Sequence, residues 1–262
     1  MFLTHQQSED IKNVLKNSLR NKFQNYQPET TFMPFHMRLL GKDRIALFSF
    51  IHSLNTNFGT TIFEPVALEL AKTQFKEAKL QTVVGSAIST QAQRVIQDIM
   101  DDLTVANSKP DKNHEIQSIR KVCRSGEIRK IKPTKVDICL HTHDDKIYLI
   151  DIKTAKPNKG SFKEFKRTLL EWVACILFEK PQTEINTLIA IPYNPYEPRA
   201  YNRWTMAGML DLDNELKVGE EFWDFLGGQG TYLELLDIFE SVGLELRAEI
   251  DDYFRKYNEL IN

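Results

Sequence analysis

The sequence predicts a mixed α/β fold in which a small mixed β-sheet is flanked by helices. Two apolar segments, 135–141 and 146–153, are rich in Ile, Val, Leu and Tyr and are separated by a short polar stretch, which predicts a β-hairpin. A segment of helical periodicity then leads to a third apolar segment at 185–191. Because two strands joined by a helix favour a parallel pair with a right-handed crossover, the sheet should combine antiparallel and parallel pairs.

Four helices are predicted before the hairpin. Apolar residues at helical spacing place the first after Ser8, which suits an N-cap. The second is Phe-rich and spans about 43–54, and the third begins near 61–65. A capping box that starts at Thr90 predicts the fourth helix, over 90–103.

Helices are also predicted on the C-terminal side of the hairpin. Ser161 followed by Glu164 predicts the start of the helix that joins the second and third strands. Gly227 and Gly228 end one of several helices in an acidic C-terminal region. The whole pattern therefore predicts a mixed sheet with helical N- and C-terminal extensions.

Charge and length divide the chain into three regions of one compact domain. A chain of 262 residues is long enough for one substantial core. We expect an N-terminal helical region at 1–57, the core at 58–204 and an acidic helical region at 205–262. The last region holds 14 Asp and Glu against 4 Lys and Arg, so its net charge is −10 and that of residues 1–204 is +8.

Basic residues concentrate in two stretches, 109–135 and 153–167. The first is also polar and turn-rich, and it predicts loops with at most one short strand. Such an asymmetry of charge favours a basic body that faces a polyanion, with an acidic tail turned outward or toward a dimer partner. The alternative is that both regions are ordinary solvated surfaces.

Composition excludes several other classes of protein. No apolar run approaches the ~18 residues of a membrane span, and the N-terminus lacks the pattern of a signal peptide. Cys123, Cys139 and Cys175 are scattered and form no CxxC pair, so we expect core residues in a reducing cytoplasm and neither a zinc site nor a disulfide framework. P-loops, dinucleotide motifs and nucleophilic triads are absent from the sequence, so no nucleotide cofactor is expected.

Three charged residues of the hairpin form the candidate catalytic site. Asp151 and Lys153 are two residues apart on one strand, so their side chains share a face about 7 Å apart. Asp137 faces the same way only if the loop between the strands has an odd number of residues, or if a bulge shifts the register. A two-residue turn at Asp144 and Asp145 would place Asp137 on the opposite face.

Two carboxylates and an ammonium on one rigid surface suit the hydrolysis of a phosphodiester. Mg²⁺ takes hard oxygen ligands and needs only one or two carboxylates besides the substrate phosphate. The carbonyl of Ile152 is a further candidate ligand, because its side chain should point into the core. Lys153 would orient the attacking water or offset the charge of the transition state. The alternative is a surface hairpin on which Asp and Lys form an ordinary ion pair.

Asp137 followed by Asp151-Ile-Lys153 resembles the PD-(D/E)xK nuclease signature, with Thr134-Lys-Val-Asp137 in place of the Pro-Asp dipeptide. Longer stretches resemble the TdeIII group of type II restriction endonucleases, namely FGTTIFEP (58–65), VGSAISTQ (84–91), YNRWTMAGML (201–210) and EFWDFLGG (221–228). The resemblance covers most of the chain from about Met37 onward. It implies a restriction-endonuclease-like core in a homodimeric, Mg²⁺-dependent enzyme that cuts double-stranded DNA at a short interrupted palindrome, with GGNCC as the expected site. Products should carry 5′-phosphate and 3′-hydroxyl ends.

Glu64 is a further candidate for the metal site. It precedes Pro65 at the predicted start of a helix, where relatives of the nuclease superfamily often carry a third acidic group. The alternative is that Glu64 serves as a capping partner or as a favourable charge at the helix N-terminus.

Five residues are candidates for DNA contact. Lys156 and Lys159 follow the predicted catalytic strand and would touch the DNA backbone, although they could equally be solvated loop lysines. Arg199, Asn202 and Arg203 lie in a run rich in aromatics and prolines that leaves the third strand. Arg reads guanine and Asn reads adenine; alternatively, the run serves to fix a long connection to the core.

Two other functions remain open from the sequence. The same core could belong to a structure-selective nuclease of DNA repair or recombination. It could also serve a DNA-binding module without catalysis, although clustered carboxylates facing phosphate argue against a site that only binds.

Overall fold

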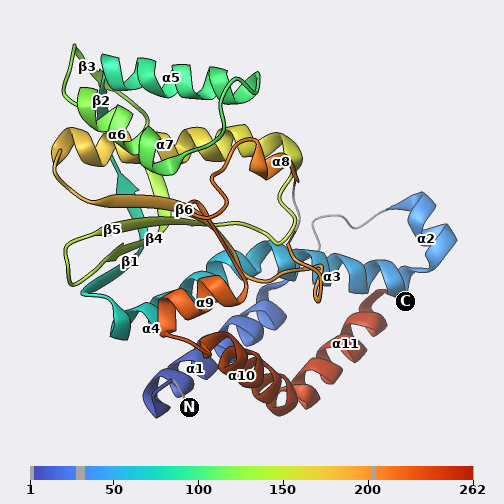
Figure 1. Ribbon diagram of the computed structural model, residues 1–262. Coiled ribbons are helices and arrows are strands. Elements are labelled where there is room, and N and C mark those ends of the chain that lie inside the picture. The colour runs from blue at the N-terminus through green and yellow to red at the C-terminus, as the bar shows by residue number, and fades with distance from the viewer. Residues whose placement is uncertain (1–2, 28–32, 202–203, 262) are drawn as a thin grey trace.

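The computed structural model describes residues 3–27, 33–201 and 204–261 (Figure 1). Its centre is a five-stranded sheet in the order β1-β4-β5-β6-β7. The strands are β1 (Glu77–Val84), β4 (Thr134–His141), β5 (Ile147–Ile152), β6 (Ile185–Ile191) and β7 (Leu216–Val218). Pairs β1–β4 and β4–β5 are antiparallel, and pairs β5–β6 and β6–β7 are parallel. The predicted mixed sheet is confirmed.

Helices cover both faces of this sheet (Figure 1). On one face lie α5 (Thr90–Thr104), α6 (Lys112–Val122) and α7 (Phe162–Glu179). On the other face lie α4 (Glu64–Gln74) and α9 (Glu220–Gly227), with α1 (His5–Asn25) and α10 (Thr231–Glu245) behind them. Because alternate side chains of a strand point to opposite faces, Leu149 and Ile189 join the first core, and Ile150 and Leu188 join the second.

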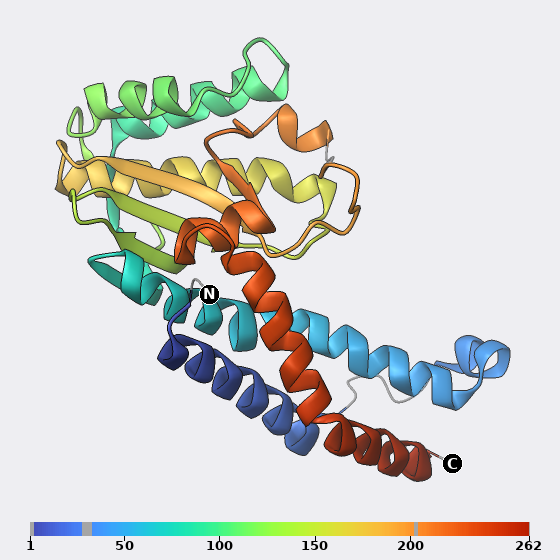
Figure 2. The same ribbon diagram turned by 60° about the horizontal axis from the view of Figure 1, so that its bottom comes forward.

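The remaining helices extend away from the sheet. A short helix, α2 (Pro34–Leu40), leads into α3 (Lys42–Phe58), and both project from the body as an arm (Figures 1 and 2). The last helix, α11 (Arg247–Ile261), packs on α3, while α10 packs on α1. The two ends of the chain therefore form one helical layer under the sheet. A short helix, α8 (Trp204–Ala207), lies on the way from β6 to β7.

The turn between β4 and β5 decides where Asp137 points. The last pair of the ladder is His141 with Ile147, so residues 142–146 form a loop of odd length. The N–H of Asp145 donates to the Thr142 carbonyl at 3.2 Å, and Asp145 adopts φ +62°. The loop thus contains a hydrogen-bonded turn that ends in a left-handed residue, as hairpin loops of odd length commonly do. The loop therefore has the odd length that places Asp137 and Asp151 on the same face. Ile138 pairs with Ile150, so the next residue of each strand brings Asp137 opposite Asp151.

Two helix starts differ from the prediction. α1 begins before Ser8, because Thr4 caps it in a capping box. α5 is capped by the side chain of Ser89, one residue before Thr90. In both cases a neighbouring hydroxyl residue satisfies the free N–H groups of the first turn.

The prediction of loops for the segment before the hairpin is wrong in part. It contains α6, which Asp111 caps by accepting the N–H of His114. The expected short strand is β3 (Ile128–Lys130), which pairs with β2 (Ala87–Ser89). Strands β1 and β7 were also not predicted: half of the residues of β1 are polar or charged, and β7 is only three residues long.

Several basic residues of this segment bind within the protein. The guanidinium of Arg124 donates to the carbonyls of Phe178 and Glu179 at 2.8 and 2.7 Å, and that of Arg120 donates to the carbonyl of Thr183 at 2.9 Å. Cations suit this place because free carbonyls and the negative end of the helix dipole meet at the C-terminus of α7. At these positions the excess of positive charge at 109–135 therefore serves the fold.

A network of buried ion pairs joins α6, α7 and the strands β6 and β7. Lys166 Nζ lies 2.5 Å from Glu115 Oε2 and 2.6 Å from Glu215 Oε2, and Lys112 Nζ lies 3.0 Å from Glu215 Oε1. Lys112 also donates to the Thr187 hydroxyl. Burial opposes ionisation of Glu215, but the charges of Lys112 and Lys166 outweigh it and hold the pKa of Glu215 below its ordinary value.

The three cysteines are buried, as expected of core residues. Burial raises the pKa of the Cys139 thiol to about 11 and that of the Cys175 thiol to about 12. Among the described helices, none combines the length and the apolar content that crossing a bilayer would require.

Candidate active site

A cleft of about 740 Å³ lies beyond the C-terminal end of β5. One wall is formed by the end of α3, with His52, Asn55 and Thr56. The opposite wall is the segment that follows β5, and a third part comes from the loop after β6. Side chains from segments far apart in the sequence thus meet at one opening, into which Glu64, Asp137, Ile152 and Lys153 also project.

Asp151 and Lys153 share a face of β5, as the sequence predicts. The Lys153 ammonium lies 2.7 Å from Asp151 Oδ2 and 5.0 Å from the centre of the Phe165 ring of α7. The ring and the carboxylate hold the lysine from two sides, so its position at the cleft is defined before any substrate binds.

Asp137 completes a group of three charged side chains. Its Oδ2 accepts a hydrogen bond from the N–H of Ile152 at 2.8 Å. If the β4–β5 ladder continued past its last pair, this N–H would bind the backbone of β4 instead. The strands separate at this point, and the Asp137 carboxyl fills the gap beside that of Asp151, whose pKa it helps to raise. The expected convergence of Asp137, Asp151 and Lys153 is present in the structure.

The environment of Asp151 favours its protonated form. Burial is the main cause that raises the pKa of Asp151 to about 7; the Lys153 charge and hydrogen bond oppose this rise, and the neighbouring Asp137 carboxyl adds to it. Two carboxyls in contact cannot both ionise at low cost without a cation between them.

Glu64 reaches the same cleft from the other face of the sheet. A π-helical turn, Gly59–Phe63, joins α3 directly to α4, and Glu64 is the first residue of α4. The side chain is buried and accepts a hydrogen bond from Gln81 Nε2 at 2.7 Å. Burial raises the pKa of Glu64, and the negative charge of Asp137 raises it further. Extra-wide helical turns of this kind occur often at functional sites.

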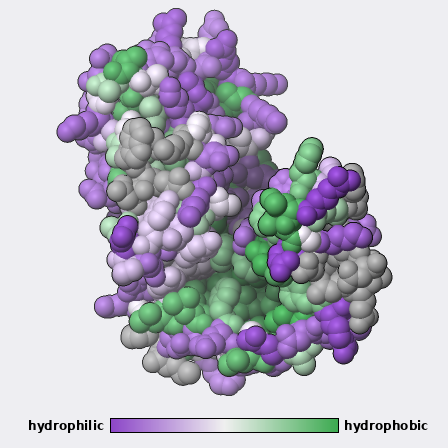
Figure 3. Space-filling model, turned by 90° about the vertical axis from the view of Figure 1, so that its right-hand side faces the viewer, coloured by the Kyte–Doolittle hydropathy of each residue, from purple (hydrophilic) through white to green (hydrophobic). Residues whose placement is uncertain are grey.

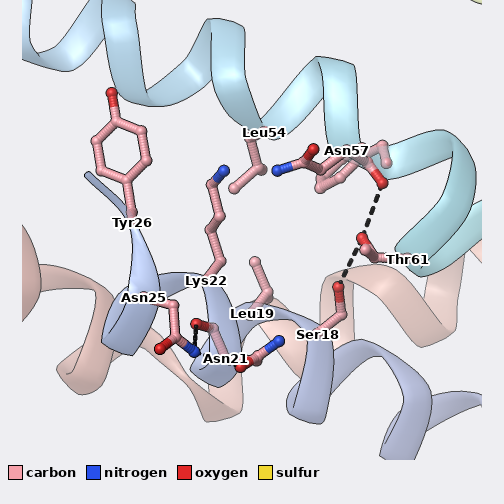
Figure 4. A pocket seen from close by; sticks show the side chains of 10 residues that line it. Ser18, Leu19, Asn21, Lys22, Asn25, Tyr26, Leu54, Asn57 and Thr61 are labelled. Carbon is pink, nitrogen blue, oxygen red and sulfur yellow. Dashed lines mark hydrogen bonds between the residues drawn. The ribbon is translucent and has the colours of Figure 1, made fainter. Parts of the chain in front are cut away.

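Contacts with α1 anchor the π-helical turn. Thr61 accepts a hydrogen bond from the Ser18 hydroxyl at 3.0 Å and donates one to the Asn57 carbonyl at 2.9 Å. Both bonds lie at the edge of a small pocket between α1 and α3 (Figure 4). The backbone that carries Glu64 is therefore held from the side away from the cleft.

The oxygen donors at the cleft fit Mg²⁺ in their chemistry. They are the carboxylates of Asp137, Asp151 and Glu64, and the Ile152 carbonyl, which faces β4 like the N–H of the same residue. Within the described residues, no three His, Cys, Asp or Glu side chains already surround one point as a metal cluster would. The Lys153 ammonium engages the Asp151 carboxylate instead, so binding of a metal there requires this side chain to turn aside.

The residues predicted to contact DNA differ in where they lie relative to the cleft. Lys156 lines it, with its ammonium 5.4 Å from the Tyr196 ring of the loop after β6. Arg199 is exposed in the same loop. Lys159 begins a short 3₁₀ turn, and its side chain lies outside the described part of the structure. Asn202 and Arg203 lie outside the described residues altogether.

The sequence did not reveal two contributions to the site. Gln81 lies on a strand that was not predicted, and its amide also donates to Asp137 Oδ1 at 3.3 Å. His52, Asn55 and Thr56 lie on the polar side of a predicted helix, where nothing in their spacing distinguishes them from ordinary surface residues. Only the placement of α3, which the π-helical turn joins to α4, brings them to the cleft.

Comparisons with known proteins identify the family. A family model described as "Type II restriction endonuclease, HinfI" matches residues 3–243. Type II restriction enzyme HgiEI of Herpetosiphon aurantiacus is 28% identical over 222 residues, which cover 83% of this chain and 79% of its own. HgiBI of the same organism is 27% identical over the same shares, and MjaII of Methanocaldococcus jannaschii is 28% identical over 80% of this chain and 62% of its own. The narrower TdeIII assignment is not confirmed by this match and stays a prediction. The chain belongs to the HinfI-type family of type II restriction endonucleases, which are site-specific deoxyribonucleases.

Proposed function

We propose that this protein is a Mg²⁺-dependent restriction endonuclease whose active site is of the PD-(D/E)xK kind and is formed by Asp137, Asp151, Lys153 and Glu64. The observation that carries the proposal is the meeting of two carboxyls and an ammonium at the end of β5, where β4 separates from it and a cleft opens. Glu64 supports the same assignment from the other side of the cleft.

Each residue has a distinct task in this proposal. Asp137, Asp151 and the Ile152 carbonyl hold the metal, with Glu64 as an additional acidic group. A bound Mg²⁺ makes water more nucleophilic and offsets negative charge on the phosphate. The Lys153 ammonium would orient the attacking water or stabilise the pentavalent phosphate, once it no longer pairs with Asp151. In-line attack of water on phosphorus, with breakage of the bond to the 3′-oxygen, would leave 5′-phosphate and 3′-hydroxyl ends.

The DNA site is proposed on less direct grounds. The resemblance to the TdeIII group suggests the interrupted palindrome GGNCC. Lys156 and Lys159 would contact the DNA backbone beside the cleft, and Arg199, Asn202 and Arg203 would approach the bases from the loop after β6. A contact with one base pair of the palindrome would contribute roughly 1–3 kcal/mol of discrimination.

Digestion of a plasmid of known sequence tests the function. With Mg²⁺, discrete fragments with one sequence at every end are expected, and EDTA should abolish them. Sequencing the ends gives the recognition site, the stagger and the terminal groups together. A continuous smear would instead indicate a structure-selective nuclease, and tight binding without cutting would indicate a non-catalytic module.

We expect Mg²⁺ binding to depend on pH through Asp151. Its pKa of about 7 means that the carboxylate needed as a ligand must first lose a proton. The apparent Mg²⁺ affinity should therefore fall about tenfold between pH 8 and pH 6. Calorimetric titration with Mg²⁺ at several pH values measures this, and an affinity that stays constant over the range would contradict it.

The stability of the metal-free protein should change with pH in the opposite direction to its Mg²⁺ affinity. Because the folded pKa of Asp151 lies above the ordinary value of 3.8, the protonated group favours the folded state below about pH 4. That contribution is lost as the pH rises to about 7. Asp151→Asn, which mimics the protonated form, should therefore raise the melting temperature relative to the parent at pH 8 but not at pH 4, in the presence of EDTA.

We further propose that two copies form a homodimer through the arm of α2 and α3. Six large apolar side chains are exposed along these two helices: Phe35, Leu39, Leu40, Leu47, Phe48 and Ile51. Figure 3 views the side from which the arm projects and shows apolar surface gathered around a hollow. Monomeric proteins rarely expose so much continuous apolar surface. Because the end of α3 also lines the cleft, a partner on this arm brings two active sites together, as cutting both strands of a palindrome requires.

Charge substitutions on the arm test this interface. Leu39 is 82% exposed, so Leu39→Glu combined with Phe48→Glu should leave the folded monomer intact and convert a dimer to monomers. Leu233→Glu on α10 is the matched control, since Leu233 is also exposed, at 62%, but lies away from the arm. Sedimentation velocity distinguishes the species. A parent that is monomeric, or a double variant that remains dimeric, would exclude the arm as the interface.

A further inference from the structure

Gln81 combines two features at one position of β1. Its φ is +49°, which places a residue other than glycine in the left-handed region in the middle of a strand. Its side-chain amide donates to Glu64 Oε2 at 2.7 Å and to Asp137 Oδ1 at 3.3 Å. Residues in this backbone conformation are uncommon, and strained backbone of this kind persists where the surrounding structure or a function requires it.

The distortion is confined to the position opposite Asp137. Leu80 pairs with Ile138 and Thr82 pairs with Val136, so the register is the same on both sides of Gln81. Between them the pair of Gln81 and Asp137 is missing from the ladder. Thus no insertion in either strand accounts for the left-handed residue. The backbone turns locally, next to the proposed active site, and then resumes its former register.

The side chains around Gln81 show what the turn accomplishes. Ala78 and Leu80, before the turn, pack with the core on the side of α4, whereas Val84, after it, belongs to the core on the side of α7. Gln81 lies where the side chains change from one face to the other. Its amide donates to Glu64, at the start of α4, and to Asp137, on the adjacent strand β4. One neutral group thus links two carboxyls whose charges repel each other.

We propose that Gln81 is a positioning residue that holds Glu64 and Asp137 in the geometry required for metal binding, and that its strained backbone is the cost of that role. The proposal rests on the proposed function of the cleft. An amide suits the task, because it donates hydrogen bonds to both carboxylates without adding charge that a metal would have to displace. Gln81 acts through these two residues, and no contact with the substrate is needed.

Replacing Gln81 by glycine tests the backbone strain and the amide hydrogen bonds separately. Gly adopts positive φ without strain, so Gln81→Gly should leave the melting temperature unchanged or raise it by a few degrees. The same change removes the amide and should weaken Mg²⁺ binding about tenfold, because a hydrogen bond to a charged group is lost at a ligand. Gln81→Glu tests the amide alone, since it keeps the length of the side chain and adds a fourth carboxylate to the site. Its Mg²⁺ affinity should differ from that of the parent by at least as much.

Lys79→Gly is the matched control. Lys79 lies two residues earlier on β1, is exposed, and is not among the residues with positive φ. Glycine there should lower the melting temperature, as it does in an ordinary strand, and should leave Mg²⁺ binding unchanged. Glycine should therefore weaken Mg²⁺ binding without lowering the melting temperature at position 81, and lower the melting temperature without changing Mg²⁺ binding at position 79.

The experiment measures Mg²⁺ binding by calorimetry and melting temperature by calorimetric scanning, each without DNA. Parental Mg²⁺ affinity in Gln81→Gly would refute the positioning role. A fall in melting temperature as large as that of Lys79→Gly would refute the claim of backbone strain. A parent that binds Mg²⁺ but cuts no DNA would count against the proposed function alone, since both readings on Gln81 are obtained without cleavage.

Discussion

Lys153→Ala should reduce the rate of DNA cleavage by on the order of 10²–10³-fold or more while leaving the fold intact. The loss follows from removing a preorganised cation at the place where charge builds on the phosphate. Folding should tolerate the change because Asp151, with a pKa of about 7, becomes neutral when its partner is removed. Single-turnover cleavage at saturating Mg²⁺ measures the effect, since it separates the chemical step from DNA binding and product release.

The matched control lies on the same strand segment. Lys146 precedes the other end of β5 and pairs with exposed Asp144 and Glu184, so Lys146→Ala removes an equal charge far from the cleft. Its cleavage rate should match that of the parent. If Lys153→Ala also cuts at the parental rate, Lys153 is not part of the catalytic machinery, and the hairpin carries only an ordinary ion pair.

Lys166→Met should lower the free energy of unfolding by about 3–5 kcal/mol, the largest effect on stability that we expect. Lys166 is fully buried and pairs with both Glu115 and Glu215. Its removal leaves Glu115 without a cation in the protein interior, and leaves Glu215 with Lys112 alone. Urea denaturation followed by circular dichroism measures the change.

A second substitution shows whether the cost comes from the unpaired charge. Replacing Glu115 as well, in Lys166→Met with Glu115→Leu, removes the uncompensated carboxylate and should recover most of the lost stability. Lys72→Met, which breaks the exposed pair of Lys72 with Glu69, should leave the free energy of unfolding nearly unchanged. A single variant as stable as the parent would mean that the network contributes little to holding α6 and α7 on the sheet.

The sequence predicted the β4–β5 hairpin well because its signal is local. Strands β4 and β5 lie where apolar side chains alternate, and the two-residue spacing of Asp151 and Lys153 places them on one face in any strand. The crossover helix and the parallel strand β6 followed from the same patterns. The position of Asp137 depended on one further fact, the odd length of the turn, which the polar stretch alone did not specify.

Charge and cap signals were less informative because they depend on context. Lys112, Arg120 and Arg124 contribute to a basic segment in the sequence, yet they bind a buried network and the end of α7. Composition records a charge but not its partner. Thr90 and Ser89 are both able to cap a helix, and which one does so is decided by the path of the preceding strand.

The sequence by itself determined the class of the protein and the mixed sheet, and it predicted the group of two acids and a lysine, since each rests on residue type and short spacing. Tertiary structure alone decided how Glu64, Gln81 and α3 reach that site. These groups come from segments separated by more than fifty residues from the hairpin, and only the burial of two cores against opposite faces of one sheet brings them within hydrogen-bonding range. The order of residues along the chain does not specify which distant segments pack together.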